Sequence, residues 1–123
     1  MEYLFVYGWL KSEYRKLHSF TPNIPVRSVG IASIQGELFH IAGYPGVKLH
    51  GSGTITGELL LIDKPLLWTT LDQFELSTPT VHNHPEYRRV RTKANWNNHQ
   101  LNCWVYEYTK PAKWIKRIRT GVF

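Results

Sequence analysis

The sequence has very little cysteine, since Cys103 is the one cysteine among 123 residues. A single cysteine excludes an intrachain disulfide framework and a cysteine-built zinc site, so nothing in the chain requires an oxidising compartment. The sequence also lacks a basic-then-apolar leader, and its longest apolar runs are far shorter than a bilayer span. We therefore expect a cytoplasmic protein with no membrane partner.

Internal repeats, low-complexity tracts and linker-like stretches are also absent, whereas large side chains are abundant. Hydrophobic residues make up 42% of the chain and aromatic residues 14%, with five Trp and seven Tyr. So many large side chains must be buried, which argues against a disordered chain. Because 123 residues suit one core and are few for two, we expect a single domain over residues 1–123.

Acidic residues are outnumbered by basic ones, and the formal net charge is +6 at pH 7, which favours anionic ligands. The basic C-terminal segment interleaves cations with Trp114, Ile115 and Ile118. One interpretation is an arm for nucleic acid or an anionic membrane surface. The other, which we favour, is that these apolar side chains pack on the domain while the cations stay solvated. We likewise expect Arg88, Arg89 and Arg91 on the solvent-facing side of a strand, with the alternative that one of them meets an acidic substrate at a pocket rim. We expect no nucleic-acid partner.

Apolar patterns predict strands over residues 3–7, 26–34, 36–41, 54–62, 88–94 and 101–108. Residues 3–7 are apolar at every position, which is typical of a central strand buried on both faces. The Asn-rich residues 95–99 predict the turn of a hairpin, and "GYPG" at residues 43–46 predicts another turn. Residues 11–20 favour a short helix or an irregular crossover.

A second helix is predicted over residues 65–75, because Pro65 suits the first turn of a helix and disfavours helix at the residue before it. A mostly β chain with short helices is an α+β domain. Since closure removes exposed strand edges, we expect a small mixed β-barrel with short flanking helices.

Glu75 is the candidate for acid–base chemistry. On a helical wheel Leu67, Leu71 and Phe74 form the inward stripe, with Glu75 on its flank and Asp72 further out. Partial burial raises the pKa of a carboxylate and allows proton exchange near neutral pH. The alternative is that Glu75 lies at a helix end and pairs with a neighbouring Arg or Lys.

Other candidate sites are weaker. His82 and His84, with His99 distant in sequence, are more typical of a polar loop than of metal ligands, so we expect no metal site. The glycines of residues 51–57 do not follow a phosphate-binding pattern, and no G-x-S-x-G motif is present. Cys103 alternates with Leu101 and Val105, which predicts a core thiol.

Five motifs occur in the order seen in one known family: "YLFVYGWL" at 3–10, "GSGTITGELLLI" at 51–62, "LDQFE" at 71–75, "EYRRVRT" at 86–92 and "CWVYEY" at 103–108. With this set, the chain resembles the γ-glutamylcyclotransferase-like family over nearly its whole length. The resemblance implies a small β-barrel with flanking helices and a pocket at one end.

The resemblance also implies an activity. The α-amine of a γ-glutamyl group attacks its own γ-carbonyl and expels a small amine or amino acid, leaving 5-oxoproline without a metal or cofactor. Glu75 matches the family's catalytic glutamate, which moves protons between the attacking and leaving nitrogens. The substrate-binding residues implied are Tyr7, Gly8, Trp9, Leu10 and Tyr87.

Three departures from the family pattern bear on the substrate. Trp9 stands where the family usually has Thr or Ser, Leu76 follows the glutamate where glycine is common, and residues 76–86 form a long segment. They leave open a different acyl-amine substrate, or the usual chemistry with Trp9 facing outward. They also leave open a module of the same fold that binds without turnover and uses its basic surface for an anionic partner.

Overall fold

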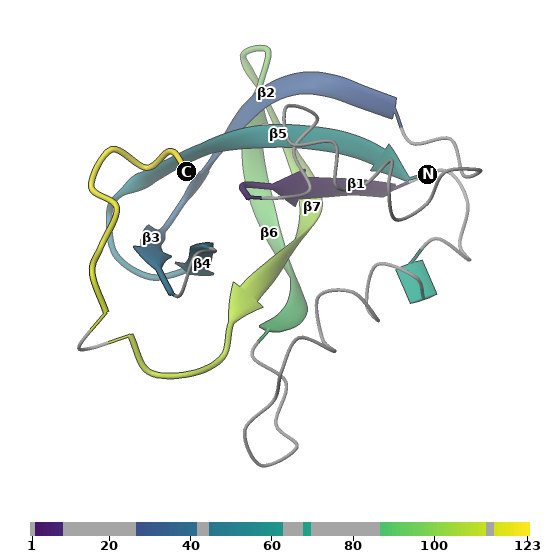
Figure 1. Ribbon diagram of the computed structural model, residues 1–123. Coiled ribbons are helices and arrows are strands. Elements are labelled where there is room, and N and C mark those ends of the chain that lie inside the picture. The colour runs from purple at the N-terminus through teal and green to yellow at the C-terminus, as the bar shows by residue number, and fades with distance from the viewer. Residues whose placement is uncertain (1, 9–26, 42–44, 63–67, 70–86, 113–114) are drawn as a thin grey trace.

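The computed structural model describes residues 2–8, 27–41, 45–62, 68–69, 87–112 and 115–123. Within these ranges the chain forms seven strands (Figure 1): β1 Glu2–Val6, β2 Arg27–Gln35, β3 Glu37–His40, β4 Pro45–Lys48, β5 Thr54–Ile62, β6 Tyr87–Trp96 and β7 His99–Tyr108.

Five of these strands close into a barrel. They are hydrogen-bonded in the order β1-β5-β2-β6-β7, and a further pairing of β1 with β7 completes the ring. The β1–β7 pair is parallel, joining Leu4 to Trp104, whereas the other four pairs of the ring are antiparallel. The predicted small mixed β-barrel is therefore confirmed.

The hairpin of β3 and β4 extends this sheet, and here one prediction is wrong. Residues Pro45 and Gly46, expected in a turn, begin strand β4. This strand pairs antiparallel with β3 and parallel with β7, where Val47 lies opposite Glu107. Proline is tolerated there because the first residue of a strand need not donate a ladder hydrogen bond.

Little of the predicted flanking helices lies within the described residues. Trp68 and Thr69, from the helix predicted over residues 65–75, are helical, and the rest of that segment and residues 11–20 lie outside the described ranges. In the part of the chain that is described, no helix has the length and apolar character to cross a membrane.

The β6–β7 hairpin shows how local sequence determines register. Asn97 and Asn98 have φ values of 50° and 64° and form a two-residue turn between the paired residues Trp96 and His99. Positive φ at both central residues is the geometry that matches the twist of a hairpin, and Asn adopts it more readily than most residues. The predicted hairpin is confirmed, with a tighter turn than the five residues expected.

The core consists of two clusters on opposite faces of the barrel wall. The interior cluster draws on all seven strands and includes Phe5, Ile34, Val105 and Cys103, which is 1% exposed, as predicted for a core thiol. The second cluster includes Leu4, Val6 and Leu60 on the other face of β1 and β5. Strand β1 is thus buried on both faces, as its continuous apolar run predicted.

The C-terminal segment lies along the outer edge of β3 (Figure 1). The Ile118 N–H donates to the Leu38 carbonyl at 2.7 Å, and the His40 N–H donates to the Lys116 carbonyl at 2.9 Å. Ile115 packs against the second cluster and Ile118 against the interior one, while Lys116 is exposed. The packing interpretation of this segment is confirmed for both isoleucines, and Trp114 lies outside the described residues.

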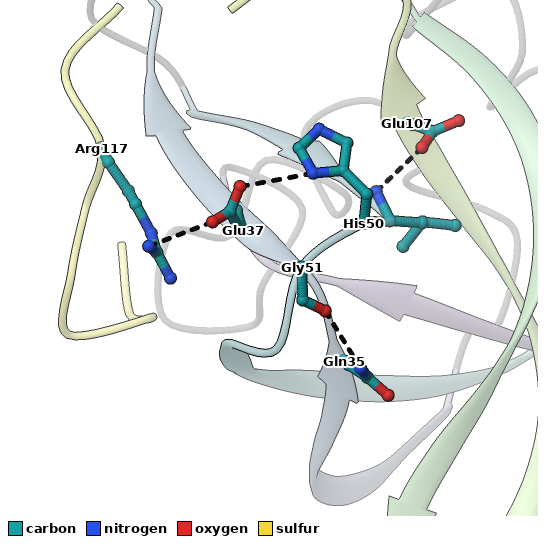
Figure 2. Close-up of polar contacts among 7 residues, drawn as sticks. Gln35, Glu37, His50, Gly51, Glu107 and Arg117 are labelled. Atoms are coloured by element: carbon teal, nitrogen blue, oxygen red, sulfur yellow. Dashed lines mark hydrogen bonds and ion pairs between the residues drawn. The ribbon is translucent and has the colours of Figure 1, made fainter.

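An ion-pair cluster on Glu37 joins this segment to the barrel (Figure 2). The carboxylate of Glu37 lies 3.0 Å from Nη1 of Arg117 and 3.4 Å from Nδ1 of His50. The Glu37 side chain is 20% exposed, so its ion pair with Arg117 is less screened than one on an open surface. The cluster fixes where the C-terminal segment crosses β3.

Candidate functional site

The candidate site lies where one edge of β7 is shared by two strands. β1 pairs with that edge at Trp104, and β4 pairs with it at Glu107. Between these positions the Tyr7 hydroxyl donates to the Tyr106 carbonyl at 2.6 Å. Because a buried carbonyl needs a donor, the tyrosine hydroxyl satisfies it where β1 leaves the edge and β4 takes its place.

Gly8 lies directly against the start of β4. A Cβ atom at Gly8 would be 2.6 Å from Cγ of Pro45, far inside carbon–carbon contact, so the absence of a side chain is what permits this approach. The Tyr87 hydroxyl donates to the Pro45 carbonyl at 2.6 Å. We call the region formed by Tyr7, Gly8, Pro45, Tyr87 and Tyr106 the β1–β4 corner.

The structure thus brings together three of the six predicted site residues. Tyr7 and Gly8 come from the end of β1, Tyr87 comes from the start of β6, and Pro45 contacts both segments. Trp9, Leu10 and Glu75 lie outside the described residues, so their site roles stay predictions.

The described part of the predicted Glu75 helix packs on the outer face of β6 and β7. The ring of Trp68 meets that of Trp104 edge to face, with centroids 6.2 Å apart. The guanidinium of Arg89 lies 4.4 Å from the Trp68 ring centroid and 4.7 Å from that of Trp104. Arg88 and Arg91 are exposed, as predicted, although the Arg91 guanidinium also lies 4.8 Å from the Trp104 ring centroid. Arg89 is half-buried and contacts both indole rings.

Two residues beside the corner were not predicted. Tyr108 packs edge to face on Tyr87 with ring centroids 5.7 Å apart, and Nζ of Lys48 lies 5.6 Å from the Tyr108 ring centroid. The alternation of "CWVYEY" places Tyr108 on the face opposite Cys103 and was the available signal for it. Nothing local marks Lys48, because its position depends on the long-range pairing of β4.

A carboxylate also binds the segment that follows β4. Glu107 accepts the Leu49 N–H at 2.9 Å (Figure 2). It also accepts from the Arg88 guanidinium at 3.2 Å. Both of its oxygens therefore have donors, which suits an acid that positions β4 on β7.

The interior thiol does not belong to this corner. Burial raises the pKa of Cys103 to about 11, against a smaller lowering by the Arg91 guanidinium. A thiol held in this way stays protonated and unreactive at neutral pH. Within the described ranges, His, Cys, Asp and Glu form no group of three or more that could hold a metal ion.

The hydroxyls of Tyr7 and Tyr87 donate to backbone carbonyls and so hold the corner together. The rings of Tyr7, Tyr87, Tyr106 and Tyr108 are buried, and the half-buried Lys48 lies beside the Tyr108 ring. A cation in this position favours a small anionic or zwitterionic molecule, with proton transfer supplied by another group.

The family model described as gamma-glutamyl cyclotransferase, AIG2-like, matches residues 4–123. A comparison with curated proteins found no match.

Among solved structures, an AIG2-like protein from Mus musculus matches with a TM-score of 0.76 and 19% identity, covering 100% of this chain and 88% of that one. The protein YtfP from Escherichia coli matches with a TM-score of 0.69 and 24% identity, covering 98% and 95%. An uncharacterised protein from Pyrococcus horikoshii matches with a TM-score of 0.69 and 22% identity, covering 100% and 90%. At these identities the likenesses bear on the fold alone.

Proposed function

Because the chain belongs to the AIG2-like gamma-glutamyl cyclotransferase family, we propose that it releases 5-oxoproline from a small γ-glutamyl amine or γ-glutamyl amino acid. The observation that carries the proposal is the family match over residues 4–123, which include every residue given a role below. The substrate's α-amine attacks its own γ-carbonyl carbon, and the bond from that carbon to the leaving nitrogen breaks. Each γ-glutamyl compound yields one 5-oxoproline and one amine.

The glutamyl part of the substrate binds at the end of β1 in this proposal. Backbone N–H groups of Gly8, Trp9 and Leu10 face its α-carboxylate, and Tyr7 and Tyr87 line the site. The contact of Gly8 with Pro45 supports the proposal because it holds the Gly8 backbone in a fixed place at the end of β1. Holding the substrate folded places its amine near its γ-carbonyl, so the reaction gains from proximity and needs no cofactor.

Glu75 is the general acid and base. The attacking nitrogen enters as an ammonium group and loses two protons by the time the ring has closed. Glu75 takes a proton from this nitrogen and returns one to the leaving nitrogen. The second proton also moves from the attacking nitrogen to the leaving nitrogen, so the amine departs as an ammonium ion. The glutamate ends in its starting state.

The test is to incubate the protein with a panel of γ-glutamyl amines and γ-glutamyl amino acids and to measure 5-oxoproline. Glu75→Gln keeps the side-chain shape and removes the acid, so product formation should fall by about 100-fold or more. Asp72→Asn, on the outer side of the same predicted helix, is the matched control and should keep activity. Full activity in Glu75→Gln means that another group is the base, and a wild-type protein inactive on the whole panel overturns the enzyme proposal.

Trp9 favours a second candidate function, because its large side chain stands where the family usually has Thr or Ser. In that case the protein is a binding module whose pocket is filled or reshaped, and its basic surface recruits an anionic partner. The expected results are no turnover by the wild-type protein, product only in Trp9→Thr, and salt-sensitive retention on heparin.

A further inference from the structure

We propose that Lys48 binds a carboxylate on the leaving group, so that the protein prefers γ-glutamyl amino acids to γ-glutamyl amines. This inference rests on the proposed cyclotransferase function and names the substrate class within it. It assigns the two ends of the substrate to different groups, with the glutamyl α-carboxylate at the Gly8 turn and the leaving-group carboxylate at Lys48.

Lys48 comes from the strand that forms the β1–β4 corner. It lies three residues after Pro45 on β4, at the end of the short strand, and is half-buried. Its ammonium group lies 5.6 Å from the Tyr108 ring centroid, and that ring packs on Tyr87 at 5.7 Å. Tyr87 in turn donates to the Pro45 carbonyl at 2.6 Å. A continuous set of contacts therefore links the ammonium group to the corner.

The aromatic contact limits where the ammonium can go. A cation over a ring face is attracted by the ring's negative potential, which favours this rotamer over the many that an exposed lysine samples. Lys48 as a whole is half-buried, as expected for a side chain whose (CH₂)₄ stem packs on a neighbouring ring. Tyr87 and Tyr108 are themselves buried, so the half-buried Lys48 is the group of this set that meets a carboxylate in our proposal.

Lys48 differs in charge balance from two arginines of β6. Arg88 pairs with Glu107 at 3.2 Å, and Arg91 pairs with Glu2 at 3.6 Å. Across the residues that the structure describes, Lys48 forms no ion pair.

Glu107 on the neighbouring strand β7 is an acidic side chain, but both of its carboxylate oxygens already have donors. These are the Leu49 N–H and the Arg88 guanidinium. The positive charge at Lys48 is therefore left for a bound anion.

The chemistry of the substrates explains why this cation selects between them. A γ-glutamyl amino acid has a second carboxylate beyond the bond that breaks, whereas a γ-glutamyl amine has none. Lysine binds such a group as a point charge with three donors and without a fixed planar geometry, so it tolerates different leaving amino acids. The net charge of +6 adds a long-range attraction for the more anionic substrate.

The experiment compares γ-glutamyl-alanine with γ-glutamyl-ethylamine, which differ only in the leaving-group carboxylate. We expect the wild-type protein to have the higher kcat/KM for γ-glutamyl-alanine. In Lys48→Met, kcat/KM for that substrate should fall by about 10- to 100-fold, mostly through KM, with little change for γ-glutamyl-ethylamine. Lys48→Glu should reverse the preference. Lys93→Met removes an exposed cation from β6, beyond the corner, and serves as the matched control.

Equal wild-type kcat/KM values for the two substrates, or an equal loss for both in Lys48→Met, overturn the inference and leave the cyclotransferase proposal intact. If the wild-type protein turns over neither compound, binding of both is measured by calorimetry, and the enzyme proposal fails only if the whole panel is also inactive. Weaker binding of γ-glutamyl-alanine to Lys48→Met than to wild type then supports the carboxylate site. Equal binding, or none to either protein, overturns it.

Discussion

Gly8→Ala tests whether the close contact between β1 and β4 forms the candidate site. The added Cβ would lie 2.6 Å from Cγ and 3.0 Å from Cδ of Pro45. Carbon atoms pack at roughly 3.5–4.0 Å, so the end of β1 and the start of β4 must separate by about 1 Å. Strain of this kind costs about 1–3 kcal/mol, and for a chain of this size each kcal/mol lowers Tm by about 3–5 °C. We therefore expect Tm to fall by roughly 3–15 °C.

The same displacement should reduce activity. It moves the Gly8 N–H away from the position proposed for the substrate's α-carboxylate, and a misplacement of about 1 Å can cost about 100-fold in rate. The assays are thermal unfolding followed by circular dichroism, and kcat/KM for 5-oxoproline release at a temperature where the variant is folded. Activity should fall well below wild type even where the variant is folded.

Pro45→Ala provides the control for this prediction. It removes the ring carbons that the new Cβ would meet and keeps the backbone carbonyl that accepts the Tyr87 hydroxyl. Gly8→Ala should therefore cost less stability in the Pro45→Ala background than in wild type. Equal costs in the two backgrounds, or a Gly8→Ala variant with the wild-type Tm and activity, would refute the reasoning.

Two further predictions concern the barrel wall. Burial raises the pKa of Cys103 from 9.0 to about 11. The folded state therefore holds this proton more tightly than the unfolded state, and the resulting stability is complete below pH 9 and lost as pH rises through 11. Between pH 9 and pH 11, urea unfolding should show that the free energy of unfolding falls by about 2–3 kcal/mol more in wild type than in Cys103→Ala. Parallel profiles of this free energy against pH would contradict the prediction. Arg89→Met should lower the free energy of unfolding in urea by about 1–2 kcal/mol, because the Arg89 guanidinium lies over the rings of both Trp68 and Trp104. If the exposed-site variant Lys93→Met loses as much, the contact with the rings contributes little.

Part of the candidate site could be predicted from sequence because its residues belong to short motifs. Tyr7, Gly8 and Tyr87 were selected in this way; the structure places Gly8 and Tyr87 against Pro45 and bonds Tyr7 to the neighbouring Tyr106 carbonyl. Pro45 itself was missed, since proline between glycines is typical of a turn and the strand it begins is stabilised by distant partners. Lys48 was missed for the same reason.

The sequence by itself determined most of the strands, the β6–β7 turn and the buried position of Cys103. These depend on side-chain alternation and on the backbone preferences of neighbouring residues such as Asn97 and Asn98, which act over a few positions. Only the tertiary structure decided that β1 and β4 both pair with the same edge of β7. It also decided that the Arg89 guanidinium lies against two indole rings. Closure of the barrel brings together segments tens of residues apart, and no local pattern records which backbone edges will meet.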